Sequence, residues 1–166
     1  MARHITIEPL TSAAFAPFGQ VIETSGAQHY PINNGMTERY HDLARVELGG
    51  VHPRPLISIF HGQPYALPLT LKLVERHPLG SQAFMPLQGR PFLVAVAPPG
   101  DFDPAKVRIF RAAATQGVNY ARGTWHHFLL AVEAESDFLV IDREGGPGEN
   151  LDEVELSEAD WIAVPL

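Results

Sequence analysis

The chain has 166 residues, a length typical of one domain, so we expect a single domain over residues 1–166. Its formal net charge is −7 and no cluster of lysine and arginine interrupts the acidic excess, so nucleic acid and anionic membranes are not expected partners. The absence of cysteine excludes disulfides and thiolate zinc sites, and no apolar stretch is long enough to span a bilayer, so we expect a cytoplasmic protein.

The 15 prolines and 14 glycines divide the chain into short segments and leave little room for long helices. A short helix is expected near residues 11–15, capped by Thr11 or Ser12 and ended by Pro17, and a second helical turn near residues 157–161. Apolar or alternating runs predict strands at residues 56–60, 69–77, 92–97, 107–110, 127–132 and 137–142. The sequence therefore predicts a mostly β fold, a barrel or sandwich with few short helices.

Residues 31–43 combine a turn signal with a concentration of polar side chains. The Asn-Asn-Gly sequence at residues 33–35 indicates that the chain reverses there. Arg39 follows closely, and a guanidinium is well shaped to hold a carboxylate with two parallel hydrogen bonds. Arg39 is therefore a candidate for binding an anionic substrate, and a surface ion pair with Glu38 or Asp42 is the alternative.

Candidate chemistry first enters with residues 75–89, ERHPLGSQAFMPLQG. Residues two apart in a strand share a face, so Glu75 and His77 project together while Arg76 points to the opposite face. The segment resembles the first signature of cupin proteins, which is His-x-His, then Glu after three or four residues, then Gly after six more. Glu75 takes the first His position, His77 the second, Gln82 the Glu position, and Gly89 the closing glycine.

The second cupin signature, approximately Pro-x-Gly-x-x-His, has a counterpart in residues 117–127, GVNYARGTWHH. Ala121 stands at the proline position, while Gly123 and His126 keep the glycine and the histidine. The resemblance implies that the two motifs lie on neighbouring strands and form one cluster: Glu75, His77, Gln82 and His126. Such a set suits a borderline divalent metal ion, held more weakly than in a typical cupin because one His and the Glu are replaced. A polar pocket that works without metal is the alternative.

Structural interpretations compete with the functional ones. For His77 and His126 the alternative is a buried, hydrogen-bonded imidazole without a functional role, and we favour function because both fall on motif positions. Trp125 and Phe128, beside the second motif, are expected to pack in the core. Arg76 is expected at the surface or at a subunit contact.

Five segments look like the successive blocks of the ureidoglycolate lyase family of allantoin degradation, formerly called ureidoglycolate hydrolases: residues 32–47, 57–64, 75–84, 117–127 and 137–143. They occur in the family's order and span nearly the whole chain. The resemblance implies a cupin fold that forms a homodimer, acts on (S)-ureidoglycolate, and is associated in some relatives with a divalent metal, reported as nickel. Arg122 also matches the family motif and is a second candidate for holding an anion.

Cleavage of ureidoglycolate to glyoxylate and urea requires removal of a hydroxyl proton and protonation of the departing nitrogen. His126 or His77 could take the hydroxyl proton, alone or through a metal, with Glu75 or the other imidazole returning a proton. Arg39 or Arg122 would hold the carboxylate. The groups predicted to contact the urea end are the amides and the hydroxyl of Asn33, Gln82, Asn119 and Tyr120.

Elimination of urea is favoured over hydrolysis at the ureido carbonyl, which needs an activated water and an oxyanion site. The chain has no cysteine, no Gly-x-Ser-x-Gly sequence, and an altered metal ligand set. An amidohydrolase that releases ammonia is the nearest alternative. Two others are a cupin that binds a small ligand without catalysis and a metal-dependent isomerase or dioxygenase acting on another small hydroxy acid.

Overall fold

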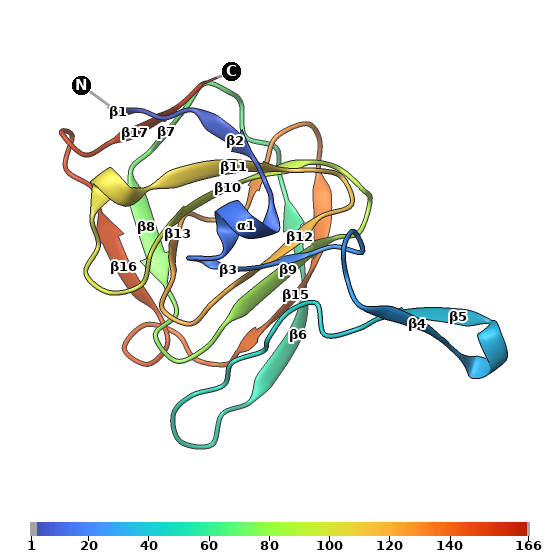
Figure 1. Cartoon of the computed structure of the whole chain (residues 1–166). Helices are drawn as coiled ribbons and strands as arrows, with labels where there is room; N and C mark the ends of the chain where they lie inside the picture. The colour runs from blue at the N-terminus through green and yellow to red at the C-terminus, as the bar shows by residue number, and fades with distance from the viewer. Residues whose placement is uncertain (1–2, 166) are drawn as a thin grey trace.

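Two β-sheets packed face to face form the body of the protein in the computed structural model, which describes residues 3–165 (Figure 1). The seven-stranded sheet contains β16 (Asp152–Glu155), β8 (Leu73–Arg76), β13 (Trp125–His126), β10 (Phe92–Ala97), β11 (Arg108–Ala112) and β2 (Ile7–Pro9) in spatial order, with β14 (Leu130–Ala131) also on β10. The five-stranded sheet contains β3 (Gly19–Ile22), β12 (Gly117–Tyr120), β9 (Gln82–Pro86), β15 (Ser136–Arg143) and β6 (Pro55–Gly62).

Two smaller sheets and three short helical segments complete the described structure. A three-stranded sheet contains β1 (Arg3–His4), β17 (Ile162–Val164) and β7 (Leu69–Leu71), and a hairpin contains β4 (His29–Ile32) and β5 (Thr37–Tyr40). The helical segments are α1 (Ser12–Phe15), the 3₁₀ turn η1 (Asn33–Gly35) and the 3₁₀ turn η2 (Pro104–Lys106). Within residues 3–165 no helix has the length and apolar character that crossing a bilayer requires.

The expected mostly β fold is confirmed, since strands account for 46% and helices for 6% of the residues that the structure describes. Over the described residues the sheets do not close into a barrel, so the sandwich is the arrangement observed. The helix expected near residues 11–15 is α1, and the Thr11 side chain accepts a hydrogen bond from the Ala14 N–H as its N-cap. The single turn expected near residues 157–161 is present as a hydrogen-bonded turn and not as a helix. Ser157 and Asp160 are joined there by a backbone and a side-chain hydrogen bond.

β10 explains why the apolar run at residues 92–97 is uninterrupted. Phe92, Val94 and Val96 belong to the core between the two large sheets, whereas the alternate residues, Leu93, Ala95 and Ala97, belong to a second core shared with β7 and β17. A strand buried on both faces has no polar side to alternate with. The prediction of this strand is confirmed to the residue.

Two predicted strands differ from the structure in their continuity. Residues 69–77 form β7 and β8 with a break at Lys72, because Leu71 pairs with β17 in one sheet and Val74 with β16 in another. Residues 127–132 do not form one strand: β13 ends at His126, and the ladder resumes only at β14. The intervening Phe128 is 38% exposed and is not part of the core, contrary to expectation.

The outer face of the five-stranded sheet is apolar along its edge. On β15, Phe138 and Val140 point into the core, so the alternate residues Leu139 and Ile141 face outward. The register pairs Leu139 with Ile59 and Ile141 with Ile57 on the edge strand β6. Ile57 is 77% exposed and Ile59 is 57% exposed, so the chain leaves this apolar surface uncovered.

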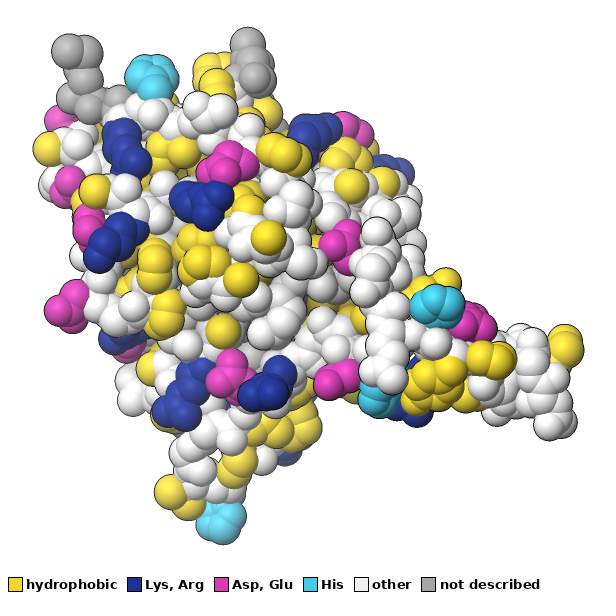
Figure 2. All heavy atoms as spheres, in the orientation of Figure 1, with side chains coloured by type: hydrophobic (Ala, Val, Ile, Leu, Met, Phe, Trp, Pro, Cys, Tyr) yellow, Lys and Arg dark blue, Asp and Glu magenta, His cyan; other side chains and the backbone are white. Residues whose placement is uncertain are grey.

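The hairpin of β4 and β5, here called the arm, projects from the body (Figure 1). Asn33, Asn34 and Gly35 all have positive φ at its tip, which confirms the predicted chain reversal. Among the described strands, β4 and β5 pair only with each other. Met36 is 86% exposed, and Figure 2 shows hydrophobic side chains along the arm.

Candidate active site

Glu75, His77 and His126 come together at one end of the sandwich. The register pairs His126 of β13 with Glu75 of β8, and His77 follows β8 directly. One ligand atom from each of the three side chains lies within 4.8 Å of the others, and the two imidazole ring centres are 5.2 Å apart. Arg76 lies on the opposite face, over the Trp125 ring and paired with Asp152. The two motifs therefore meet in space.

A tight turn delivers His126 into the cluster. Gly123 has a φ of +78°, which favours glycine, and its N–H donates to the His77 carbonyl. The chain then enters β13, where Trp125 packs in the second core, the one shared with β7 and β17, and His126 points to the opposite face, between the two large sheets. The Tyr120 ring stacks on His126 with 4.4 Å between centres and 14° between planes. The imidazole of His126 thus has two ring neighbours, Tyr120 and His77.

A chain of hydrogen bonds fixes His77 and Gln82. His77 Nδ1 lies 2.9 Å from the Asn150 carbonyl, and His77 Nε2 lies 3.1 Å from Gln82 Oε1. Gln82 Nε2 donates to Asp142 Oδ2 at 3.1 Å. Both ring nitrogens of His77 therefore face oxygen acceptors. A neutral imidazole donates from only one of its nitrogens, so a cation held between Nε2 and Oε1 would complete this arrangement.

Burial sets the protonation of the other two groups. Burial raises the pKa of Glu75, the positive field of His77 partly opposes that rise, and Glu153 adds to it. Burial, reinforced by His77, lowers the pKa of His126 to about 3, so this ring is neutral at neutral pH. Its Nδ1 lies 3.1 Å from the His127 carbonyl and 3.8 Å from Glu75 Oε1. The cluster therefore combines a basic carboxylate with a neutral imidazole.

The donor set fits a divalent metal ion. His126 Nε2 is buried and lacks a hydrogen-bond partner among residues 3–165, although a buried polar nitrogen normally has one. The close approach of His77 Nε2 and Gln82 Oε1 also suits two ligands of one ion. Together with Glu75, these side chains offer two imidazoles, an amide oxygen and a carboxylate, a combination that borderline divalent ions accept.

Comparison with known proteins gives a consistent result. The sequence model of the family described as ureidoglycolate lyase matches residues 2–163. The chain belongs to the ureidoglycolate lyase family. The ureidoglycolate lyase of Burkholderia mallei (strain NCTC 10229) is 56% identical over 158 residues, covering 95% of this chain and 92% of the relative. That of Brucella melitensis biotype 2 (strain ATCC 23457) is 59% identical over 154 residues, covering 93% and 90%.

Three further residues that the sequence predicted for the site were Gln82, Tyr120 and Arg122. Gln82 and Tyr120 are buried beside the cluster and point inward. Arg122 lies at the rim, where its Nε donates to the Pro78 carbonyl at 2.6 Å and its backbone N–H donates to Glu47. Gln82 and Tyr120 therefore border the cluster, and Arg122 lies beside the residue that follows His77.

The structure does not bring the remaining predicted residues of this family member to the cluster within one chain. Asn119 precedes the inward-pointing Tyr120 and therefore faces outward, where its Nδ2 donates to Gln20 and to the Arg45 carbonyl. Asn33 and Arg39 lie on the arm, which projects away from β8 and β13 (Figure 1). Asn33 Nδ2 donates to Thr37, and the Arg39 guanidinium lies 6.0 Å from the centre of the Tyr30 ring.

Two members of the site were missed from the sequence. Asp142 was treated only as the end of an apolar strand, although alternation from Phe138 and Val140 places it on the inner face. Asn150 lies in the Gly-rich loop after β15, where its side chain accepts from the Leu79 N–H and donates to the Arg143 carbonyl. The carbonyl that holds His77 comes from this loop, and no sequence pattern indicated it.

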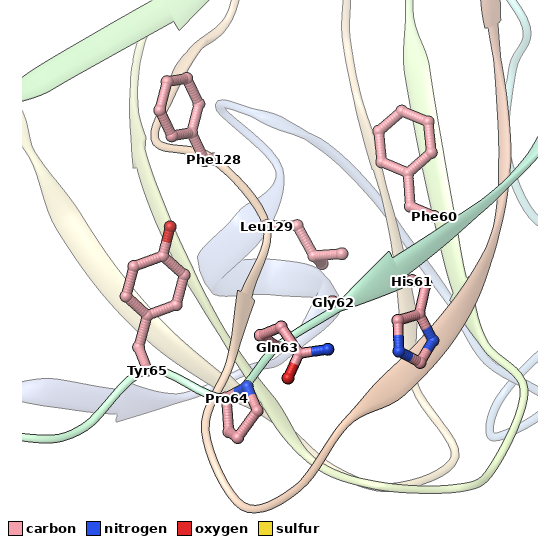
Figure 3. Close-up of a pocket in the computed structure, with 8 residues that line it drawn as sticks. All are labelled: Phe60, His61, Gly62, Gln63, Pro64, Tyr65, Phe128 and Leu129. Atoms are coloured by element: carbon pink, nitrogen blue, oxygen red, sulfur yellow. The ribbon is translucent and has the colours of Figure 1, made fainter.

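A separate cavity of about 450 Å³ lies where β6 ends (Figure 3). Its lining comes from the end of β6, the loop that follows, and the segment between β13 and β14: Phe60, His61, Gly62, Gln63, Pro64, Tyr65, Phe128 and Leu129. The Tyr65 and His127 rings pack edge to face, with 6.4 Å between the ring centres. None of the predicted site residues lines this cavity.

Proposed function

We propose that this chain cleaves (S)-ureidoglycolate into glyoxylate and urea, within one cupin-like catalytic domain in the cytoplasm. The observation that carries the proposal is the convergence of Glu75, His77 and His126 in a member of the ureidoglycolate lyase family. The relatives described above carry the name ureidoglycolate lyase over nearly their whole length. The net charge of −7 supports a small-molecule substrate and not nucleic acid.

The reaction needs two proton transfers and no water. One carbon of ureidoglycolate carries a hydroxyl, a carboxylate and the ureido nitrogen. The O–H bond breaks, its electrons form the aldehyde C=O of glyoxylate, the C–N bond breaks, and the nitrogen gains a proton to become urea. A base and an acid placed at neighbouring heteroatoms are sufficient.

Glu75 and one of the two imidazoles share these transfers in the proposed mechanism. The raised pKa of Glu75 makes its ionised form a stronger base toward the hydroxyl proton. His77 is held at Nδ1 by the Asn150 carbonyl, so in the absence of an ion its Nε2 can carry the proton that goes to the departing nitrogen. His126 stays neutral in its buried position and orients the hydroxyl.

A divalent metal, nickel by family resemblance, would be held weakly by Glu75, His77, Gln82 and His126. Such an ion, when bound, lowers the pKa of a coordinated hydroxyl. The substrate itself would contact Gln82 and Tyr120 through its urea end, and Arg122 through its carboxylate. Burial favours the protonated hydroxyl of Tyr120 by raising its pKa, so this side chain is a hydrogen-bond donor.

The working form is proposed to be a homodimer that covers the apolar outer face at Ile57 and Ile59. A two-stranded ribbon that packs on nothing is marginally stable, which supports contact of the arm with the second copy. Asn33 and Arg39 would then bind the substrate's urea end and carboxylate in the partner's site. Asn119 lies on the opposite face of the five-stranded sheet. It would therefore support the site indirectly, by holding the segment that carries Arg45.

Product analysis tests the function. Purified protein incubated with (S)-ureidoglycolate should release glyoxylate and urea in equal amounts, with ammonia no higher than in a protein-free control. Stoichiometric ammonia without urea would assign the amidohydrolase reaction instead. No turnover at all would favour a ligand-binding cupin.

A further inference from the structure

Asp142 decides which atom of Gln82 faces the site. The two residues lie opposite each other in the register of β9 and β15, and Asp142 Oδ2 accepts from Gln82 Nε2 at 3.1 Å. With the amide nitrogen engaged there, Oε1 is the atom left to face His77 Nε2. A flipped amide would set its oxygen against a carboxylate, so two acceptors would meet without a proton.

The pair also relocates a negative charge. Gln82 stands where the cupin signature has a glutamate, so an amide replaces a carboxylate at the cluster. The carboxylate lies instead on the neighbouring strand, hydrogen-bonded to that amide. Carboxylates placed behind a ligand orient it and increase its basicity. An amide supported in this way recovers part of what the replaced glutamate would supply.

Asp142 has no evident structural task that would explain its position. Five register pairs of backbone already join β9 to β15, so the side chain is not needed to hold the strands together. Its second oxygen, Oδ1, is buried and lacks a hydrogen-bond partner within residues 3–165. A carboxylate oxygen that is buried without a partner costs free energy, which is unexpected in a purely structural role.

We propose that Asp142 is a positioning residue of the site, which holds the carbonyl oxygen of Gln82 toward His77 and strengthens that oxygen as a ligand for a divalent cation. The effect on turnover rests on the proposed function, whereas the effect on metal affinity does not. Gln82 and Asp142 then form one functional unit, in which Gln82 faces His77 and Asp142, behind it, carries the charge.

Calorimetric titration with NiCl₂ of three variants and the wild type tests this unit. Asp142→Leu removes the acceptor and should weaken nickel binding by about tenfold or more. Gln82→Glu places two carboxylates side by side, where they share a proton that nickel must displace, so this variant should bind nickel more weakly than the wild type. The double variant Gln82→Glu/Asp142→Asn restores the hydrogen bond with donor and acceptor exchanged, and should bind at least as tightly as the wild type.

Asp137→Leu is the matched control, because Asp137 lies on the same strand and also accepts from a glutamine amide, Gln88 Nε2, at 2.7 Å. It should leave the nickel affinity unchanged, and circular dichroism should show every variant folded. Unchanged nickel binding by Asp142→Leu, a double variant no better than Gln82→Glu, or a wild type that binds no nickel would each overturn the proposal. Failure of the proposed function would appear separately, as missing urea with the nickel results intact.

Discussion

The ring of Tyr120 is stacked on the ring of His126, with 4.4 Å between the ring centres and 14° between the ring planes. The ring centre of His77 lies 5.2 Å from that of His126. Because His126 is only 2% exposed, the protonation and hydrogen bonding of its imidazole depend on these two neighbours and on Glu75. The site is therefore part of the packed interior and not an addition to the surface.

Removal of either imidazole should abolish most activity and leave the fold intact. We expect His77→Ala and His126→Ala each to lower kcat/KM by about 100-fold or more, as loss of a proton-transfer or substrate-binding group does. Steady-state kinetics with circular dichroism measures both effects. His4→Ala, at an exposed position on β1, is the control and should be unaffected. Near-normal turnover by either variant would remove that histidine from the proposed mechanism.

Metal should be present after purification but below one ion per chain. The amide of Gln82 and the carboxylate of Glu75 stand where a cupin has Glu and His, so we expect weaker retention of the ion. Elemental analysis of protein prepared without chelator measures the occupancy, and dialysis against EDTA should then remove the ion. Full occupancy that survives EDTA would mean that the altered ligand set binds tightly.

A charge on the outer face of the five-stranded sheet should separate the subunits. Ile59→Asp places a carboxylate in the middle of the apolar edge and should convert a dimer into a monomer in sedimentation velocity. Glu158→Lys, at an exposed position after β16, is the control for a change of charge elsewhere. A wild-type monomer at micromolar concentration, or a dimeric Ile59→Asp variant, would contradict the assignment of this face.

Mixed dimers distinguish an arm that acts on its own chain from one that acts on its partner. Arg39→Ala alone should raise KM, because a carboxylate contact is lost. In mixed dimers of Arg39→Ala and His126→Ala chains, one of the two sites has both an intact cluster and an intact arm only if the arm reaches across. Equal co-expression should then recover about a quarter of the wild-type sites. Activity no greater than that of the two parents would exclude action across the interface.

The ion pair of Glu8 and Arg108 should contribute modestly to stability, and only above acidic pH. Arg108 donates to both oxygens of Glu8, at 2.9 and 2.6 Å, and to the Ala14 carbonyl, so it ties β2, β11 and α1 together. These hydrogen bonds lower the pKa of Glu8 below its ordinary 4.5. The contribution is therefore present above that value and is lost as pH falls through the lower folded-state pKa.

Glu8→Gln measures that contribution. The variant should lower the free energy of unfolding by less than about 1 kcal/mol at pH 7, since both side chains are partly exposed. The difference from the wild type in urea denaturation should shrink as the pH is lowered toward 3. A difference that stays constant across this range would show that charge is not its origin.

The alternation rule predicted the part of the site that lies on regular strands. It placed Glu75 and His77 on one side of residues 73–77 and Arg76 on the other, which is what the structure has. The same rule, applied to Phe138 and Val140, would have found Asp142. Motif spacing added His126, because the turn at Gly123 fixes where the next strand begins.

Position in space was not predictable where the chain is irregular. Nothing in residues 31–43 shows that the reversal at Asn33 forms the tip of a projecting arm. The same turn residues suit a hairpin that packs on the body and one that projects from it. Asn119 and Tyr120 are adjacent, yet only the register with β9 shows which of them faces the cluster. The break at Lys72 likewise depends on two different partner strands.

The pairing of Gln82 with Asp142 also limits how this protein can change over generations. A glutamate introduced at position 82 alone creates two adjoining carboxylates, and an asparagine introduced at position 142 alone leaves two amides without the charge. If Asp142 positions Gln82 as proposed, each single exchange gives a poorer site, whereas the two exchanges together give a working pair. A change at one position is then expected to be tolerated only together with the matching change at the other.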